Sequence, residues 1–184
     1  MKTIWIVDGS YLLKSAHKFT PERFDYIKLK NELQALNGGP FFESYYLDST
    51  FDPPTDAQNA FHTFLKYAPP HGPKMRVQLY KLKTMDVECP QDGHRFTRTI
   101  QKGVDVGIAT LIIKLAVQGL YDRLVLSAGD GDFEDAIDYV KSELHKEVVI
   151  CGFKDTVSAD LQSYANEVVW LDDLWQQIKK QPHR

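Results

Sequence analysis

Short apolar runs that alternate with longer amphipathic segments are the feature that most limits how this chain folds. Three of these runs are TIWIVD (3–8), RLVLSA (123–128) and EVVICGF (147–153). Each is apolar along most of its length, as strands are when helices cover both faces of a parallel sheet. The alternation therefore predicts an α/β fold, a three-layer α/β/α sandwich with a mostly parallel central sheet.

The segments between the runs carry apolar residues at helical spacing. In segment 104–119 they recur at i, i+3, i+4, i+7 and i+8, and Gly119 follows as a stop signal. These residues are Ile108, Leu111, Ile112, Leu115 and Ala116. We expect further helices at 21–36, with Pro21 at the start, and at 54–68.

Residues 41–48 are rich in aromatic side chains and residues 75–83 alternate, so both predict strands. Residues 84–103 match neither pattern, and QDGH between VEC and RFTRTI is a hairpin or loop signal. A chain of 184 residues is long enough for one domain with a substantial core. We expect a single domain over 1–184, with a hairpin or loop insertion at 84–103.

Composition excludes several classes of protein. The chain is 43% hydrophobic and 26% charged, with a formal net charge of -3, which argues against non-specific coating of duplex nucleic acid. No apolar run approaches the roughly 18 residues of a membrane span, and MKTIWIVDGS does not read as a signal peptide. Cys89 and Cys151 lie far apart and suggest no disulfide framework. We expect no membrane contact and a cytoplasmic location.

Aspartates stand at three places where α/β folds build their sites. Asp8 ends TIWIVD, Asp130 and Asp132 follow RLVLSA, and Asp105 lies in the first turn of the helix before RLVLSA. If the two runs are neighbouring strands, the four carboxylates converge at the carboxyl edge of the sheet. Four carboxylates repel one another unless they are protonated or bind a cation, and oxygen-only ligands suit Mg²⁺ or Mn²⁺. The pattern indicates metal-assisted hydrolysis of a phosphodiester.

Two of these aspartates also have simpler interpretations. Asp132 fits a helix N-cap, where aspartate is favoured, and Asp105 fits a favourable charge at a helix N-terminus. Asp8 is harder to explain in this way because the strand before it is expected to be buried. Other acidic residues nearby are interpreted as solvated charge: Asp122, Glu134, Asp135 and Asp138.

The sequence lacks the motifs of other catalytic classes. It contains no GxxxxGK[ST] phosphate loop, no GxGxxG fingerprint and no GxSxG nucleophile elbow. Cys89 and His94 lack the further ligands that a zinc site needs. A small-molecule phosphohydrolase or phosphate-accepting domain fits poorly, because Ser10 stands where a DxD pattern would place its second aspartate.

Basic and aromatic residues are interleaved in segment 74–102, which suits a single nucleic-acid strand through phosphate contacts and base stacking. A solvated hairpin face is the alternative for this segment. Tyr11, close to Asp8, either offers a stacking ring or is buried. The candidate substrate-binding residues are Lys102, Ser10, Tyr11, Arg95 and Arg98.

Several of these stretches together resemble a known family. VDGS near the start, KGVDVGIATLI, and YDRLVLSAGDGDFEDAIDYVKSELHKEVVICG are similar to the NYN domain, in the LabA-like branch of the PIN-like nucleases. The resemblance covers nearly the whole chain, and KGVD followed by GDGDF is its most specific part. It implies a PIN-like sandwich and a metal-dependent ribonuclease that acts on single-stranded or structured RNA.

The resemblance also implies roles for individual residues. Asp8, Asp105, Asp130 and Asp132 would ligate one or two Mg²⁺ or Mn²⁺ ions, and a bound water would attack phosphorus. The chain departs from the family at Tyr11, where asparagine is frequent, and at Asn166, where an Ala-Asp pair is frequent. A non-catalytic RNA-binding or regulatory NYN domain is the alternative function, and a homo-oligomer or a protein partner stays open.

Overall fold

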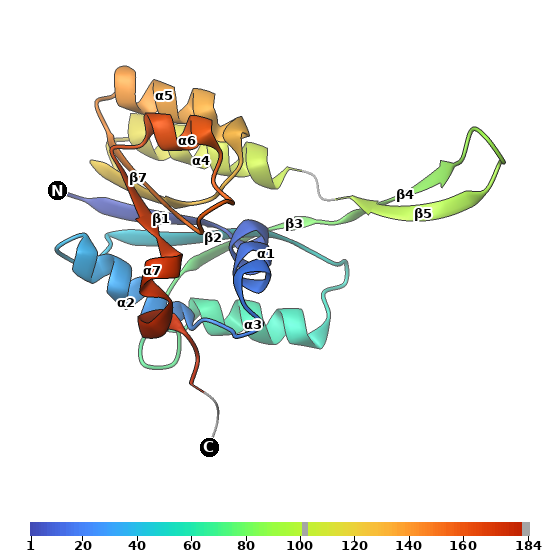
Figure 1. The fold of residues 1–184 in the computed structure, drawn as a ribbon, viewed down its shortest axis with the longest axis horizontal. Helices are drawn as coiled ribbons and strands as arrows, with labels where there is room; N and C mark the ends of the chain where they lie inside the picture. Colours follow the sequence, from blue (N-terminus) through green and yellow to red (C-terminus); the bar gives the residue numbers. More distant parts are fainter. Residues whose placement is uncertain (101–102, 182–184) are drawn as a thin grey trace.

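A parallel sheet of six strands forms the centre of the molecule (Figure 1). The computed structural model describes residues 1–100 and 103–181. Within these residues the strands lie in the order β3-β2-β1-β6-β7-β8, and every neighbouring pair is parallel. Their bounds are β1 (Thr3–Asp8), β2 (Glu43–Thr50), β3 (Arg76–Lys81), β6 (Arg123–Ser127), β7 (Glu147–Gly152) and β8 (Glu167–Trp170).

Helices cover both faces of this sheet (Figure 1). One layer contains α1 (Gly9–Phe19), α2 (Tyr26–Leu36), α3 (Asp56–Lys66) and α7 (Leu171–Ile178), and the other contains α4 (Val104–Val117), α5 (Glu134–Ser142) and α6 (Ala159–Tyr164). Trp5 and Val7 of β1 pack into the core of the first layer, and Ile4 and Ile6 into that of the second. Both faces of β1 are therefore buried, and the predicted three-layer α/β/α sandwich is confirmed.

The strand order reverses at the centre of the sheet. Strands added after β1 extend the sheet through β2 and β3 on one side, whereas β6, β7 and β8 extend it on the other. Val7 of β1 lies opposite Ser127 of β6, and Asp8 lies opposite Leu47 of β2. The carboxyl ends of these three strands are thus side by side, at the kind of switch point where parallel α/β sheets bind ligands.

One expected helix start was wrong, and the N-cap interpretation left open for Asp132 does not hold. The helix expected from Pro21 begins at Tyr26, because the Asp25 side chain accepts hydrogen bonds from the Ile27 and Lys28 backbone N–H groups and so caps α2. Asp132 is not an N-cap. It lies within the short 3₁₀ turn η1 (Gly131–Phe133), and Asp130 accepts the hydrogen bond from the Asp132 N–H instead.

Residues after β3 form a two-stranded antiparallel hairpin that projects away from the body of the domain (Figure 1). Its strands are β4 (Lys83–Glu88) and β5 (Arg95–Ile100). Among the described residues, these strands pack chiefly on each other rather than on the helices or the central sheet. The hairpin follows the carboxyl end of β3 and precedes α4 in the chain, so its base lies at the same edge of the sheet as Asp8.

Neither a membrane span nor a disulfide contributes to this architecture. In the described part of the chain, every helix is too short or too polar to cross a membrane. Cys89 and Cys151 are both free thiols. The two apolar cores, one on each face of the sheet, therefore provide the main stabilisation.

Replacing residues 83–100 with a flexible Gly/Ser linker should leave the domain folded. Because the hairpin packs chiefly on itself, we expect the melting temperature to change by less than about 4 °C, which corresponds to about 1 kcal/mol for a chain of this size. Far-UV circular dichroism and thermal unfolding measure this. Loss of the cooperative transition would show that the hairpin is part of the core.

Candidate active site at the carboxyl edge of the sheet

Asp8 is a buried carboxylate at the junction of β1 and α1. Its side chain is the N-cap of α1 and accepts a hydrogen bond from the Tyr11 backbone N–H at 3.0 Å, while the residue is only 7% exposed. The pKa of Asp8 is raised to about 6, chiefly by burial and also by the charges of Asp105 and Asp48, against the lowering effect of the Tyr11 hydrogen bond. The negative charge of Asp8 therefore destabilises the folded protein unless a positive charge compensates it.

Asp105 faces the same region from the first turn of α4. Burial raises its pKa, and so do the charges of Asp130 and Asp132. Gly103, the N-cap residue of α4, has φ of 93°, a left-handed conformation that favours glycine. The Tyr80 ring packs against this turn, where a Cβ on Gly107 would lie 1.9 Å from the Tyr80 hydroxyl.

The GDGDF turn after β6 holds Asp130 and Asp132, both exposed. Asp130 Oδ1 accepts a hydrogen bond from the Asp132 N–H at 3.1 Å, which keeps the turn compact. Gly129 has no positive φ, so glycine is not required there by the backbone conformation. It is required because other groups pack closely against its Cα. A Cβ there would lie 2.3 Å from the Tyr11 ring and 2.2 Å from the Thr156 carbonyl oxygen.

Asp48 is a fifth acidic residue at this edge, and the sequence interpretation missed it. It lies at the end region of β2, and its carboxylate accepts hydrogen bonds from the Ser10 hydroxyl at 2.8 Å, the Tyr46 hydroxyl at 2.7 Å and the Ser49 N–H at 2.7 Å. A Cβ on Gly9 would lie 2.7 Å from Asp48 Oδ2. The signal was present in the sequence, because FFESYYLD ends in aspartate as TIWIVD does.

Mutual charge effects link these carboxylates into one group. Asp48 and Asp105 act on Asp8, and Asp130 and Asp132 act on Asp105. Nevertheless, within the described residues no three His, Cys, Asp or Glu side chains are placed closely enough to hold a metal ion. The donors are all carboxylate oxygens, which is the chemistry that Mg²⁺ and Mn²⁺ prefer. The chemical type of these donors therefore fits Mg²⁺ or Mn²⁺.

The two candidates next to Asp8 have partners within the protein. Ser10 donates its hydroxyl hydrogen bond to Asp48. Tyr11 is largely buried, with its hydroxyl 2.9 Å from Thr156 Oγ1 and accepting a hydrogen bond from the Phe153 N–H at 3.3 Å. Of the two interpretations left open for Tyr11, the structure therefore favours a packed ring over an exposed stacking surface.

The hairpin candidates differ from one another. Arg95 forms an ion pair with Glu88 at 3.0 Å, whereas Arg98 has no ion-pair partner among the described residues. Lys102 lies outside the described residues. Arg95 and Arg98, which we expected to play the same role, therefore differ in whether their charge is already paired.

Asn166, one of the two departures from the family pattern, lies away from this edge. Its side-chain Oδ1 accepts a hydrogen bond from the Val148 N–H, near the start of β7. β8 begins at the next residue, so position 166 is at the amino edge of the sheet. The asparagine therefore removes no carboxylate from the acidic group.

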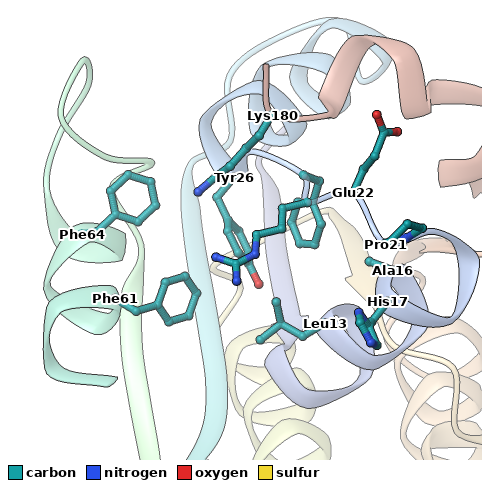
Figure 2. A pocket seen from close by; sticks show the side chains of 11 residues that line it. Leu13, Ala16, His17, Pro21, Glu22, Tyr26, Phe61, Phe64 and Lys180 are labelled. Atoms are coloured by element: carbon teal, nitrogen blue, oxygen red, sulfur yellow. The ribbon is translucent and has the colours of Figure 1, made fainter. Parts of the chain in front are cut away.

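A separate pocket of about 660 Å³ lies between α1, segment 21–26 and α3, and none of the four predicted aspartates lines it. Figure 2 shows Phe61 and Phe64 projecting from α3 on the side that faces Tyr26. The Tyr26 hydroxyl is buried, and both burial and the charge of Asp48 raise its pKa. Tyr26 therefore lines the pocket while its hydroxyl is affected by the charge of Asp48, and the four predicted aspartates belong to the acidic edge rather than to the pocket.

The comparisons with known proteins identify the family of the chain. The NYN domain family matches residues 2–172, so the chain belongs to the NYN domain family. NYN domains are usually nucleases. A search of curated proteins found no match.

One solved structure of similar fold supports the observed architecture. A protein of unknown function from Vibrio parahaemolyticus is similar with a TM-score of 0.71 at 22% identity, covering 97% of this chain and 96% of that one. MurG from Acinetobacter baumannii reaches a TM-score of 0.41 at 10% identity, covering 100% of this chain and 47% of that one. The second similarity is too low to bear on fold or function.

Asp8→Asn should stabilise the metal-free protein at neutral pH. The pKa of Asp8 is about 6 in the folded protein and close to its ordinary value of about 3.8 in the unfolded chain, so ionisation of Asp8 destabilises the wild type as the pH rises from about 4 to about 6. We expect Asp8→Asn to be more stable by about 1–3 kcal/mol at pH 7.5, with the difference vanishing near pH 4. Urea unfolding in EDTA measures this.

Asp138→Asn is the matched control. Asp138 is exposed on α5 and accepts a hydrogen bond from the nearby Ser142 hydroxyl. It should show little change at either pH. A destabilised Asp8→Asn at pH 7.5 would contradict the view that the Asp8 charge is costly in the folded state.

Proposed function

We propose that this NYN domain is a metal-dependent ribonuclease, in the LabA-like branch of the PIN-like nucleases, that acts on RNA in the cytoplasm. The observation that carries the proposal is the coupling of Asp8, Asp105, Asp130 and Asp132 across the junction of β1 with β6. Each pair-wise repulsion favours either protonation or a shared cation. Asp8 and Asp105 have raised pKa values, which is typical of functional rather than merely solvated carboxylates.

The four aspartates would hold Mg²⁺ or Mn²⁺. A bound divalent cation supplies positive charge that lowers the pKa of a water molecule and stabilises the negative charge that develops on the phosphate. Asp8 is oriented by the Tyr11 N–H and Asp130 by the Asp132 N–H, so backbone groups fix the direction of both carboxylates. Carboxylates held in fixed directions would place a cation accurately against the phosphate of a substrate.

Asp48 has a supporting role in this proposal. Its carboxylate already accepts three hydrogen bonds, from Ser10, Tyr46 and Ser49, so few of its lone pairs are free for a cation. Its charge raises the pKa of Asp8. Asp48 would therefore position the α1 end of the site and increase the affinity of Asp8 for positive charge.

The alternative function is an RNA-binding or regulatory NYN domain that does not cleave. The observation that favours it is the lack, within the described residues, of three side chains placed closely enough to hold a metal ion. Cleavage assays separate the two functions directly.

Neutralising the acidic group should abolish hydrolysis. With Mn²⁺ and end-labelled single-stranded RNA, we expect Asp8→Asn, Asp105→Asn and Asp130→Asn each to lower the cleavage rate by at least about 100-fold, because each removes a charge from the proposed cation site. Asp138→Asn should cleave like the wild type. Gel analysis of a time course measures the rates.

EDTA should stop cleavage, and fresh Mn²⁺ should restore it. Cleavage that persists in EDTA, or that is equal in the wild type and Asp130→Asn, would refute the proposed mechanism. Binding of RNA without any cleavage would support the alternative function.

Divalent cations should stabilise the wild type through the same residues. At a Mn²⁺ concentration of about 100 times Kd, binding adds about 2.7 kcal/mol, which raises the melting temperature by several degrees. Asp8→Asn combined with Asp105→Asn should lose this shift, while Asp138→Asn keeps it. An equal shift in all three proteins would place the cation elsewhere.

A further inference from the structure

The β4–β5 hairpin has two faces of different chemistry. Residues directly opposite each other in an antiparallel pair project to the same side, and successive pairs alternate between the sides. One side, called the basic face below, consists of Lys83, Met85, Val87, Phe96, Arg98 and Ile100. The other, called the polar face, consists of Thr84, Asp86, Glu88, Arg95, Thr97 and Thr99.

Within the two hairpin strands, the positive charges that have no ion-pair partner all lie on the basic face. Lys83 and Arg98 have no ion-pair partner among the described residues, and no carboxylate belongs to this face. On the polar face, Arg95 is paired with Glu88 at 3.0 Å, and Thr97 donates to Asp86 at 3.2 Å. The basic face therefore attracts an anion, whereas on the polar face the positive charge of Arg95 is already paired with Glu88.

The basic face also exposes large apolar side chains. Phe96 and Met85 are each 46% exposed. The His94 ring stacks with Phe96, with the ring centroids 6.4 Å apart and the ring planes at 20°. Flat exposed rings beside unpaired cations are the combination by which proteins bind single-stranded nucleic acid, through base stacking and phosphate contacts.

We propose that single-stranded RNA binds along the basic face of the hairpin and is led from there to the acidic site. The proposal rests on the proposed function for the class of substrate. Phe96 and His94 stack with bases, and Lys83 and Arg98 contact phosphates. Arg95, which was a candidate substrate-binding residue together with Arg98, does not contact the RNA.

The base of the hairpin adjoins the acidic group. Tyr80, near the end of β3, packs against Gly103, the N-cap residue of α4, and against Gly107 within α4, and these two glycines flank Asp105 in the sequence. Phe96 is four residues from Ile100 at the base of β5, about 13 Å along an extended strand. A strand of RNA stacked on Phe96 and extended toward the base of the hairpin therefore approaches Asp105.

A second copy of the chain fits the basic face less well. Two basic faces in a symmetric contact would bring Lys83 and Arg98 of one copy toward those of the other, with no carboxylate on either face to pair with them. A polyanion removes this repulsion. Charge complementarity therefore favours RNA over self-association.

Charge reversals on opposite faces of β5 test the proposal. Fluorescence anisotropy with a labelled single-stranded RNA of about 12 nucleotides, in EDTA to prevent metal-dependent cleavage, gives Kd for the intact 184-residue chain. We expect Arg98→Glu and Phe96→Ala each to raise Kd by about tenfold or more. Arg95→Glu, the same change of charge on the polar face, should raise it by less than about threefold.

Two further measurements sharpen the assignment. The slope of log Kd against log salt should fall by about 0.7 in Arg98→Gln and stay unchanged in Arg95→Gln, since only Arg98 releases a counterion. Duplex RNA, whose bases are not free to stack, should bind more weakly, and Phe96→Ala should not alter its Kd. Thermal unfolding checks that each variant is folded.

The outcomes separate this proposal from the proposed function. Equal effects of Arg95→Glu and Arg98→Glu, or no binding of RNA by the wild type in EDTA, would overturn it. So would a dimer of the wild type that Phe96→Ala converts to a monomer by light scattering. Face-specific binding without cleavage under Mn²⁺ would support the binding surface while refuting the nuclease.

Discussion

The parallel pairing of β1 with β6 is the constraint on which the candidate site depends. It brings Asp8, near the start of the chain, to the same edge as the GDGDF turn. A buried hydrogen bond from Trp5 Nε1 to Ser127 Oγ, 2.9 Å long, links the two strands and helps to fix their register. A slip of one residue would exchange the side chains that face the two helical layers, and would bury Asp8 on the wrong side.

Asp8 and Asp48 show how two neighbouring carboxylates can be given different tasks. Three hydrogen bonds satisfy Asp48, whereas Asp8, which is more deeply buried, receives one from the Tyr11 N–H. A buried carboxylate with few donors gains most from a cation. This difference supports Asp8 as a ligand and Asp48 as the residue that holds Ser10 and the α1 end of the site.

Local signals in the sequence predicted the fold, because buried parallel strands and amphipathic helices each leave a pattern within a few residues. The start of α2 was missed because the capping by Asp25 outweighs the preference of Pro21 for a first helical turn. The packing of Tyr11 could not be predicted, because it depends on glycines at 129 and 152 that are distant in sequence. A Cβ on Gly152 would lie 2.3 Å from the Tyr11 hydroxyl.

The site was predicted only in part for the same reason. The four aspartates were expected from strand ends and a helix start, and their roles stay predictions. Asp48 was missed because a strand-end aspartate has meaning only once β2 is known to lie beside β1. Arg95 and Arg98 differ only through the register of β4 with β5, which decides the face on which each one lies.

The hairpin precedes α4 in the chain, so the basic face, proposed to bind RNA, is followed closely in sequence by Asp105 of the acidic group. Under the proposed function, the acidic group would repel the phosphates of its own substrate, and its affinity for RNA would therefore be low. A strand held on the hairpin is tethered next to that group, and short tethers produce effective concentrations on the order of millimolar. Under the proposed function, the acidic edge would then need little affinity for RNA of its own, and its carboxylates could be selected for binding the cation rather than the substrate.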